Sequence, residues 1–181
     1  MKYRNEITIK NGQKCIIRNG TFEDGPEVST FFTTTHGETD YLLSYPEEST
    51  RDDEKQSNYL KETTESDREI ELLAIVDGKV VGMAGFHAIG SKYKVRHRAE
   101  FGITVSKNYW GQGIGKAIMN ACIKCAKEAG YIQLELDVVA DNTRAIELYK
   151  KLGFIEFGRN PKGFQSKYSG FQELVYMRLE L

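Results

Sequence analysis

Residues 96–139 constrain the fold of this chain more than any other part of the sequence. This stretch begins with a strand-like run that ends at Val105, turns through residues 110–116 (WGQGIGK), and continues as an amphipathic helix. After Gly130, apolar and polar residues alternate over residues 132–139, which is the two-residue period of a strand. A strand, a helix and a second strand in this order predict a right-handed crossover between two parallel strands.

Further strands and helices are predicted on both sides of this crossover. Asp77-Gly78 lies between two β-prone runs and is typical of a type I′ hairpin, because both turn positions need a positive φ. The other predicted strands cover residues 14–18, 72–76, 79–88, 154–157 and 174–179, and the other predicted helices cover residues 21–35, 47–64 and 142–152. This order predicts an α/β (α+β) fold, with helices on both faces of a mixed, largely antiparallel sheet of six or seven strands.

Length and composition suit a soluble protein with one domain over residues 1–181. The chain has a mass of 20.6 kDa, 40% apolar residues and 28% charged residues, which argues against disorder. It has no apolar run of about 18 residues and no hydrophobic segment of a signal peptide, so we expect a cytoplasmic protein that does not enter a membrane. Cys122 and Cys125 lie in the apolar stripe of a predicted helix, where core packing is a better interpretation than zinc binding, and no metal is expected.

The charge is unevenly distributed along the chain. The whole sequence carries −1, but residues 38–71 carry twelve acidic and four basic side chains, which leaves +7 on the rest. Nucleic-acid binding needs a concentrated basic face, so a nucleic-acid partner is not expected. The separation of charge suggests instead that two oppositely charged ligands meet on this protein.

The glycine turn at residues 110–116 is a candidate anion site. Alternate glycines allow a tight turn, and the free N–H groups of the helix that follows favour a phosphate. The simpler alternative is a strand-to-helix turn without a ligand. Ala117 stands where a P-loop needs a hydroxyl group, and the G-x-G-x-G spacing differs from the dinucleotide fingerprint G-x-G-x-x-G. An ATP- or NAD-binding protein is therefore a weaker alternative.

Three segments together carry a resemblance to a known family. They are residues 100–105 (EFGITV), the glycine turn, and residues 142–154 (NTRAIELYKKLGF). In this order and spacing they resemble the GCN5-related N-acetyltransferase (GNAT) family, whose signatures are (Arg/Gln)-x-x-Gly-x-(Gly/Ala) and Asn-x-x-Ala-x-x-x-Tyr-x-x-x-Gly-Phe. One departure is Trp110, which stands where the family usually has Arg or Gln. The polar contact that this position normally makes is then missing, or Gln112 supplies it.

The resemblance implies a GNAT-like sheet whose two central parallel strands, here residues 100–105 and 132–139, splay apart. Acetyl-CoA enters that gap as co-substrate, with its pantetheine arm along the first strand and its pyrophosphate on the glycine turn. The residues expected on this basis to contact acetyl-CoA are Ile103, Thr104, Val105, Trp110, Gly111, Gln112, Gly113, Ile114, Gly115, Lys116, Asn142, Ala145 and Tyr149.

The resemblance also implies catalytic roles for Tyr149 and Glu100. Asn142, Ala145 and Tyr149 share one helix face, and Tyr149 is expected to donate a proton to the departing CoA thiolate. The alternatives are that Asn142 only caps the helix and Tyr149 only fills the core. Glu100 is the candidate base that deprotonates the amine through water, and its alternative is a cross-strand pair with a basic residue, since Arg96 and Arg98 are close in sequence. His87 and His97 are weaker candidate bases, and a surface or core histidine is the better interpretation of each.

The expected function is transfer of an acetyl group to a primary amine by direct attack in a ternary complex. The acceptor is either a small molecule or a protein N-terminus. In this family the first two helices and a late loop shape the acceptor side, so residues 24–65 and the polar, glycine-bearing stretch 159–170, expected as a loop, are the corresponding segments. Four acidic residues near the first two helices suggest a cationic acceptor, although a solvated helical surface explains them equally well. They are Glu38, Asp40, Glu47 and Glu48. A homodimer is compatible with the resemblance, and an acetyl-CoA-binding module without turnover is the alternative function.

Overall fold

The computed structural model describes residues 1–48 and 52–181. Three short 3₁₀ helices, at Phe22–Asp24, Pro46–Glu48 and Lys107–Tyr109, lie in connections between the larger elements. The larger elements are β1 (Arg4–Thr8), β2 (Lys14–Asn19), α1 (Gly25–Glu38), α2 (Asp53–Glu65), β3 (Ile70–Val76), β4 (Lys79–Ala88), β5 (Arg98–Val105), α3 (Ile114–Glu128), β6 (Gln133–Val139), α4 (Thr143–Lys151), β7 (Ile155–Ser166) and β8 (Gly170–Glu180).

The strands form one mixed sheet in the order β1-β2-β3-β4-β5-β6-β8-β7. Within the described residues it has eight strands, and β5 with β6 is its one parallel pair. The predicted fold class is confirmed, with one more strand than the upper expected number. The additional strand is β1, whose side chains are almost all exposed, so it lacks the apolar alternation by which a strand is predicted.

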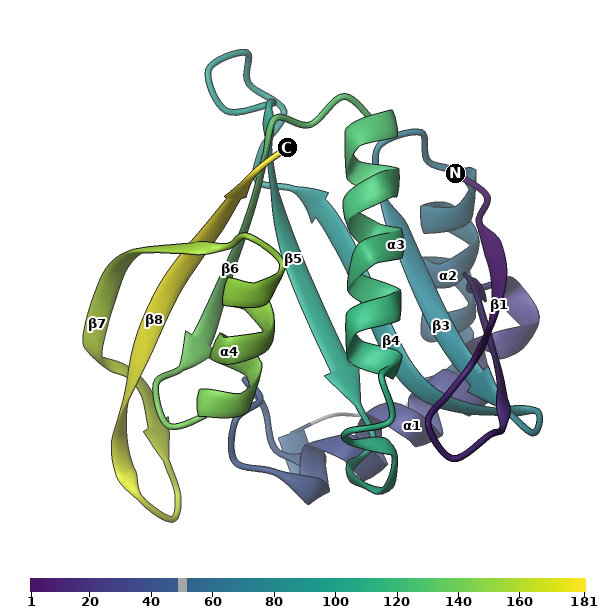
Figure 1. Ribbon diagram of the computed structural model, residues 1–181, viewed down its shortest axis with the longest axis horizontal. Helices are drawn as coiled ribbons and strands as arrows, with labels where there is room; N and C mark the ends of the chain where they lie inside the picture. Colours follow the sequence, from purple (N-terminus) through teal and green to yellow (C-terminus); the bar gives the residue numbers. More distant parts are fainter. Residues whose placement is uncertain (49–51) are drawn as a thin grey trace.

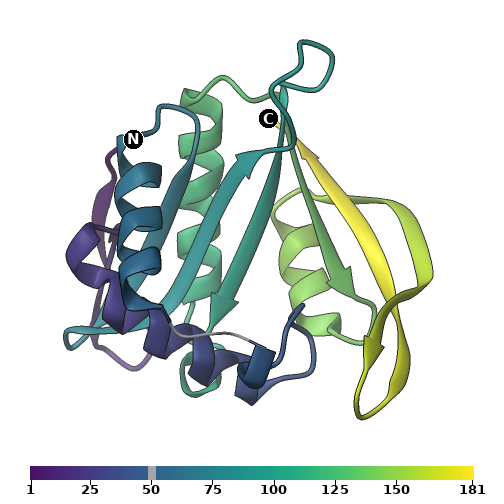
Figure 2. The same cartoon turned by 180° about the vertical axis from the view of Figure 1, so that it is seen from behind.

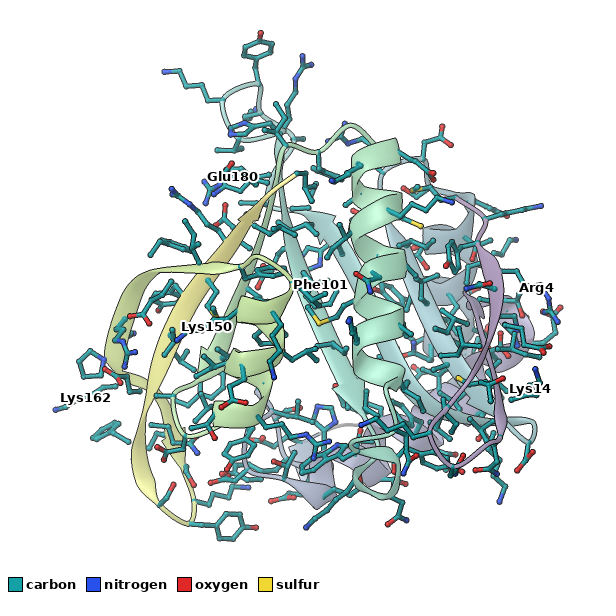
Figure 3. The ribbon with its side chains drawn as sticks, viewed as in Figure 1. Arg4, Lys14, Phe101, Lys150, Lys162 and Glu180 are labelled. Atoms are coloured by element: carbon teal, nitrogen blue, oxygen red, sulfur yellow. The ribbon has the colours of Figure 1, made fainter. Side chains whose placement is uncertain are left out.

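Two helices cover each face of the sheet. Figure 1 shows α3 and α4 in front of the strands, and Figure 2 shows α1 and α2 on the opposite side, which we call the α1–α2 face. The larger core lies between the sheet and α3, where Ile118 and Cys122 are fully buried. In Figure 3 the buried Phe101 lies in the middle of the molecule, while the labelled Arg4 and Lys162 lie at its rim. None of the described helices has the length and apolarity needed to span a bilayer.

The parallel strands β5 and β6 pair over only three residues each. Their partners run from Arg98 opposite Gln133 to Glu100 opposite Glu135, and beyond these the two strands separate (Figure 1). The predicted crossover and the splayed central strands are therefore present. The helix between them ends as its sequence predicts, because Gly130 has a left-handed φ of 79° after the last turn of α3.

Two segments differ from the sequence-based expectation. The predicted helix at 47–64 is α2 (Asp53–Glu65) preceded by a 3₁₀ turn, and residues 49–51 of that prediction lie outside the described residues. The stretch 159–170, expected as a loop, instead belongs to the long hairpin of β7 and β8. Its polar and glycine-rich sequence hides the strand because β7 is an edge strand with mostly exposed side chains, and its register shifts between Asn160 and Phe164.

The packing of α3 on the sheet predicts a large cost for shortening Ile118. This side chain is fully buried, so Ile118→Ala leaves a cavity and should lower the free energy of unfolding by about 2–5 kcal/mol. Urea denaturation followed by circular dichroism measures the change. Asn120→Ala, at an exposed position of the same helix, is the control and should change stability by less than about 0.5 kcal/mol. Equal effects of both variants would contradict this packing.

Candidate active site

A cleft of about 620 Å³ opens where β5 and β6 separate. Its walls are the end of β5, the glycine turn, one side of α4, and the end of α1 with the start of the loop after it. Of the residues predicted to contact acetyl-CoA, all except Gln112 line this cleft, namely Ile103, Thr104, Val105, Trp110, Gly111, Gly113, Ile114, Gly115, Lys116, Asn142, Ala145 and Tyr149. The structure thus brings together two segments that lie about thirty residues apart in the sequence.

The glycines of the turn have two different roles. Gly111 and Gly113 have φ values of 79° and 95°, which side chains rarely adopt, so they allow the tight turn itself. Gly115 lies in the first turn of α3, where an added Cβ would lie 3.3 Å from Leu148 Cδ2 of α4. Its missing side chain therefore lets the two helices approach each other. The first N–H groups of α3 have no acceptor within the helix and lie at the cleft, which makes this end of it suited to an anion.

Gln112 faces away from the cleft and fastens the turn to the β1–β2 hairpin. Its side-chain Oε1 accepts a hydrogen bond from the backbone N–H of Asn11 at 3.1 Å, and its backbone carbonyl accepts one from the backbone N–H of Lys10 at 3.2 Å. Because its side chain is held on the hairpin and does not line the cleft, Gln112 is a poor substitute for the polar residue that the GNAT signature has at position 110. Its role here is to hold the turn in place.

Trp110 takes part in the site in a way that the sequence pattern does not reveal. Its indole Nε1–H donates a hydrogen bond of 2.6 Å to the carbonyl of Val105, and the Arg144 guanidinium lies over its ring at 5.2 Å. Arg144 also comes within 3.5 Å of the position that a Cβ on Gly111 would take. A positive charge therefore reaches the glycine turn from α4, across the cleft.

Sequence reasoning did not single out Arg144, Lys10 or Lys151, although all three line the cleft together with the predicted Lys116. Arg144 could have been found, since it lies between Asn142 and Ala145 on a helix expected to face the ligand. Lys10 had no such signal, because its place depends on β1 and on the turn that follows it.

Tyr149 lies on the cleft-facing side of α4 and is 7% exposed. Burial raises the pKa of its hydroxyl group above the ordinary value of 10.0, and the negative charge of Asp137 raises it further. The hydroxyl group is therefore protonated at neutral pH and available as a donor. Asn142 begins the same helix, where its Oδ1 accepts the N–H of Ala145 at 3.3 Å, so it caps α4 and leaves its side-chain NH₂ as a donor at the cleft.

The acidic residues after α1 are paired within the chain. Glu38 accepts the backbone N–H of Lys107 at 2.8 Å, and Glu48 accepts that of Tyr45 at the same distance. Glu47 forms an ion pair with Lys167. Asp40 accepts hydrogen bonds from four side chains on its own loop and on the β7–β8 hairpin, which are Tyr45, Ser166, Ser169 and Gln172. Asp40 and Glu47 therefore join the loop after α1 to that hairpin, whereas Glu38 joins the end of α1 to the turn after β5.

Glu100 lies on the α1–α2 face and does not line the cleft. Its side chain is 52% exposed, and its Oε2 lies 3.5 Å from Nε2 of His87, its register partner on β4. Glu100 thus has a cross-strand basic neighbour, but it is His87 and not one of the expected arginines, since Arg98 pairs with Glu135 of β6.

Glu71 is a second carboxylate on this face, and sequence reasoning did not identify it. It is 8% exposed and accepts a hydrogen bond of 3.1 Å from the hydroxyl group of Tyr59. Burial raises its pKa from the ordinary 4.5 to about 7, although the bond from Tyr59 opposes the rise. The available signal was a single acid inside the otherwise apolar strand IELLAIV.

The raised pKa of Glu71 predicts a loss of stability as the pH rises from about 4.5 to about 7. Below this window the carboxyl group is protonated in both states, and above it the folded state alone bears the cost of a buried charge. Glu71→Gln should therefore gain about 1–3 kcal/mol relative to wild type between pH 4.5 and pH 8. Urea denaturation across this range measures the difference, with the exposed Glu62→Gln as control. A constant difference between wild type and Glu71→Gln would contradict the prediction.

Comparison with known proteins places this site in a family. Residues 35–154 match the sequence model of the acetyltransferase (GNAT) family. The L-amino acid N-acetyltransferase AaaT of Escherichia coli (strain K12) is 32% identical over 108 residues, which are 59% of this chain and 65% of the relative. The matched part thus spans slightly less than two thirds of that protein.

Solved structures match over most of the chain. An acetyltransferase of the GNAT family from Streptococcus pneumoniae is 27% identical and superposes with a TM-score of 0.88, covering 92% of this chain and 99% of its own. The fold also matches yncA from Salmonella typhimurium, solved with its cofactor acetyl-CoA, with 21% identity, a TM-score of 0.81, and coverage of 92% of this chain and 94% of that one.

Proposed function

This chain belongs to the acetyltransferase (GNAT) family, and from that premise we propose that it transfers an acetyl group from acetyl-CoA to a primary amine. The observation that carries the proposal is the cleft between β5 and β6. One end of it has the free N–H groups of α3 and several basic side chains, and a buried tyrosine lines it as well. These features fit a ligand with a phosphate-bearing end and a reactive thioester.

The cleft residues fit the parts of acetyl-CoA in turn. The pyrophosphate would bind the N–H groups at the start of α3, with Lys116 and Arg144 as counter-charges. The pantetheine arm would pair with backbone groups of Ile103, Thr104 and Val105 as an additional strand. The carbonyl of Val105 already accepts the indole N–H of Trp110, so this arm relies on the other backbone groups of the segment.

The reaction requires a neutral amine, because a protonated one has no lone pair with which to attack the thioester carbonyl. As the new C–N bond forms and the C–S bond breaks, the hydroxyl group of Tyr149 donates its proton to the departing sulfur. Glu100 remains the candidate that takes up the amine proton through water, and its exposed pair with His87 gives this proton a route to solvent.

The proposed acceptor is a small molecule with a primary amine, and a free L-amino acid is the first class to test because AaaT carries that name. A protein N-terminus is the second class. Among the acidic residues at the end of α1 and after it, Glu38 lines the cleft and would face a cationic acceptor directly. Asp40 and Glu47 are paired within the chain and would favour such an acceptor through the field they create. Spermidine, compared with neutral amino acids at low salt, tests this preference.

Binding of the cofactor should depend on Arg144. Arg144→Ala removes the positive charge that α4 extends across the cleft to the glycine turn. The Kd for CoA should rise about 5–10-fold, since one charge-assisted contact contributes about 1–1.5 kcal/mol. Isothermal titration calorimetry measures this change. Lys150→Ala, at an exposed position of α4 outside the cleft, is the matched control. No heat with wild type would overturn the proposed function, and equal Kd values for both variants would remove Arg144 from the site.

Turnover should depend on Tyr149. Tyr149→Phe keeps the buried ring but removes the proton donor, so kcat should fall about 100-fold while the Kd for acetyl-CoA changes less than about twofold. Release of free thiol from acetyl-CoA in the presence of the amine panel measures kcat. An unchanged kcat would leave Tyr149 as a packing residue. Binding of acetyl-CoA by wild type without thiol release would favour the non-catalytic alternative.

A further inference from the structure

Building on the proposed function, we propose that the acceptor amine binds over Gly102 on the α1–α2 face, where Glu71 holds its ammonium group. Three neighbouring strands place the relevant residues in one row across the sheet. Glu71 of β3 pairs with Gly85 of β4, and Gly85 pairs with Gly102 of β5. Directly paired residues project to the same face of a sheet, so the row lies entirely on the α1–α2 face.

The Glu71 carboxylate extends over β4 because Gly85 has no side chain. A Cβ placed on Gly85 would lie 2.7 Å from Oε2 of Glu71 and 2.9 Å from its Cδ. The space that a side chain on β4 would fill is therefore occupied by the carboxylate. The next residue in the row beyond Gly85 is Gly102 of β5, so the carboxylate extends toward Gly102.

Above Gly102 the space is open. A Cβ placed there would meet no heavy atom within 4 Å, and its φ is outside the left-handed region, so the backbone itself does not require glycine. In Figure 2 much of β4 and β5 has no helix over it on this face, and the neighbouring Ile103 and Thr104 line the cleft. A group bound over Gly102 would thus lie between the Glu71 carboxylate and the place proposed for the thioester.

The surrounding charges favour an ammonium group. Tyr59 of α2 gives Glu71 one hydrogen bond, and a carboxylate can accept several. Among the described residues, this carboxylate acts on the buried Cys122 of α3, while Glu69 at the start of β3 acts on Tyr59. Along β5, Glu100 pairs with His87 and Arg98 pairs with Glu135, so both of these bases already have a carboxylate partner. Negative charge therefore predominates around the open space.

In this inference the carboxylate of Glu71, and not Glu100, takes the proton that the amine must lose, and Glu100 with His87 lies on the route of that proton to solvent. With a pKa of about 7, Glu71 is matched to proton transfer near neutral pH. One N–H⁺ proton passes from the ammonium group to a carboxylate oxygen of Glu71, and the freed lone pair forms the C–N bond as the C–S bond breaks. The nitrogen then loses its second proton, which replaces the proton that Tyr149 gives to the departing sulfur. Glu71 then returns the proton to solvent, where Glu100 and His87 are exposed.

Kinetics with defined amines test this site in the intact protein. The acceptors are the twenty L-amino acids, spermidine and n-butylamine, and the variants are Glu71→Gln, Gly102→Ala, Gly102→Val and the control Glu62→Gln. We expect Glu71→Gln to raise the KM of the best of these amines at least 10-fold and to remove the rise of kcat/KM near pH 7. Gly102→Val should raise the same KM at least 10-fold, but Gly102→Ala less than threefold, because a single methyl group fits the open space.

The cofactor half of the site gives an independent readout. Calorimetry should show a Kd for CoA within twofold of wild type for all four variants. If Glu71→Gln does not fold, the comparison of Gly102→Ala with Gly102→Val still tests whether the amine binds over Gly102. An unchanged amine KM in Gly102→Val would overturn the inference, as would a wild type that binds CoA but acetylates none of these amines. A wild type that does not bind CoA would overturn the proposed function, and this inference with it.

Discussion

The early separation of β5 and β6 is the constraint on which the rest of the site depends. Two parallel strands that part after three residue pairs leave backbone N–H and C=O groups without sheet partners, and such groups are costly when buried. The protein satisfies one of them itself, since the indole of Trp110 bonds to the carbonyl of Val105. The remaining groups line a cleft that an extended, amide-bearing ligand can complete.

The glycine turn at the start of α3 is supported from both sides. Gln112 fastens it to the β1–β2 hairpin, and Arg144 approaches it from α4. Trp110 links the turn to β5 and also provides the ring over which Arg144 lies. Although Trp110 replaces the polar residue of the GNAT signature, a positive charge still lies near the anion site, because Arg144 supplies it from α4.

Local patterns in the sequence predict much of this architecture. The Asp77-Gly78 hairpin, the crossover through α3 and the alternation in β6 all follow from periodicity and turn chemistry, and the structure contains each of them. Many of the cleft-lining residues were predictable because three short segments carry them, namely residues 103–105, 110–116 and 142–149. The roles of Tyr149 and Glu100, the cytoplasmic location and the homodimer remain predictions.

Other features could not be read locally because they depend on contacts across the fold. The exposed strand β1 has no apolar period, and the edge strand β7 has a polar sequence with a shifted register. The place of Lys10 at the cleft depends on β1. The place of the Glu71 carboxylate depends on the missing side chain of Gly85, and only the pairing of β3 with β4 brings these two residues together. Long-range register, which the sequence does not display, decides all four.

The hydrogen bonds around Asp40 have a consequence for how acceptor preference can diverge. This carboxylate ties the loop after α1 to Ser166 and Gln172, which lie more than 120 residues later in the chain. Two distant segments therefore form one mechanical unit beside the cleft. Exchanging the β7–β8 hairpin alone with that of a relative would remove the donors that Asp40 has on this hairpin. New acceptor specificities in this lineage should therefore arise through paired changes in both segments.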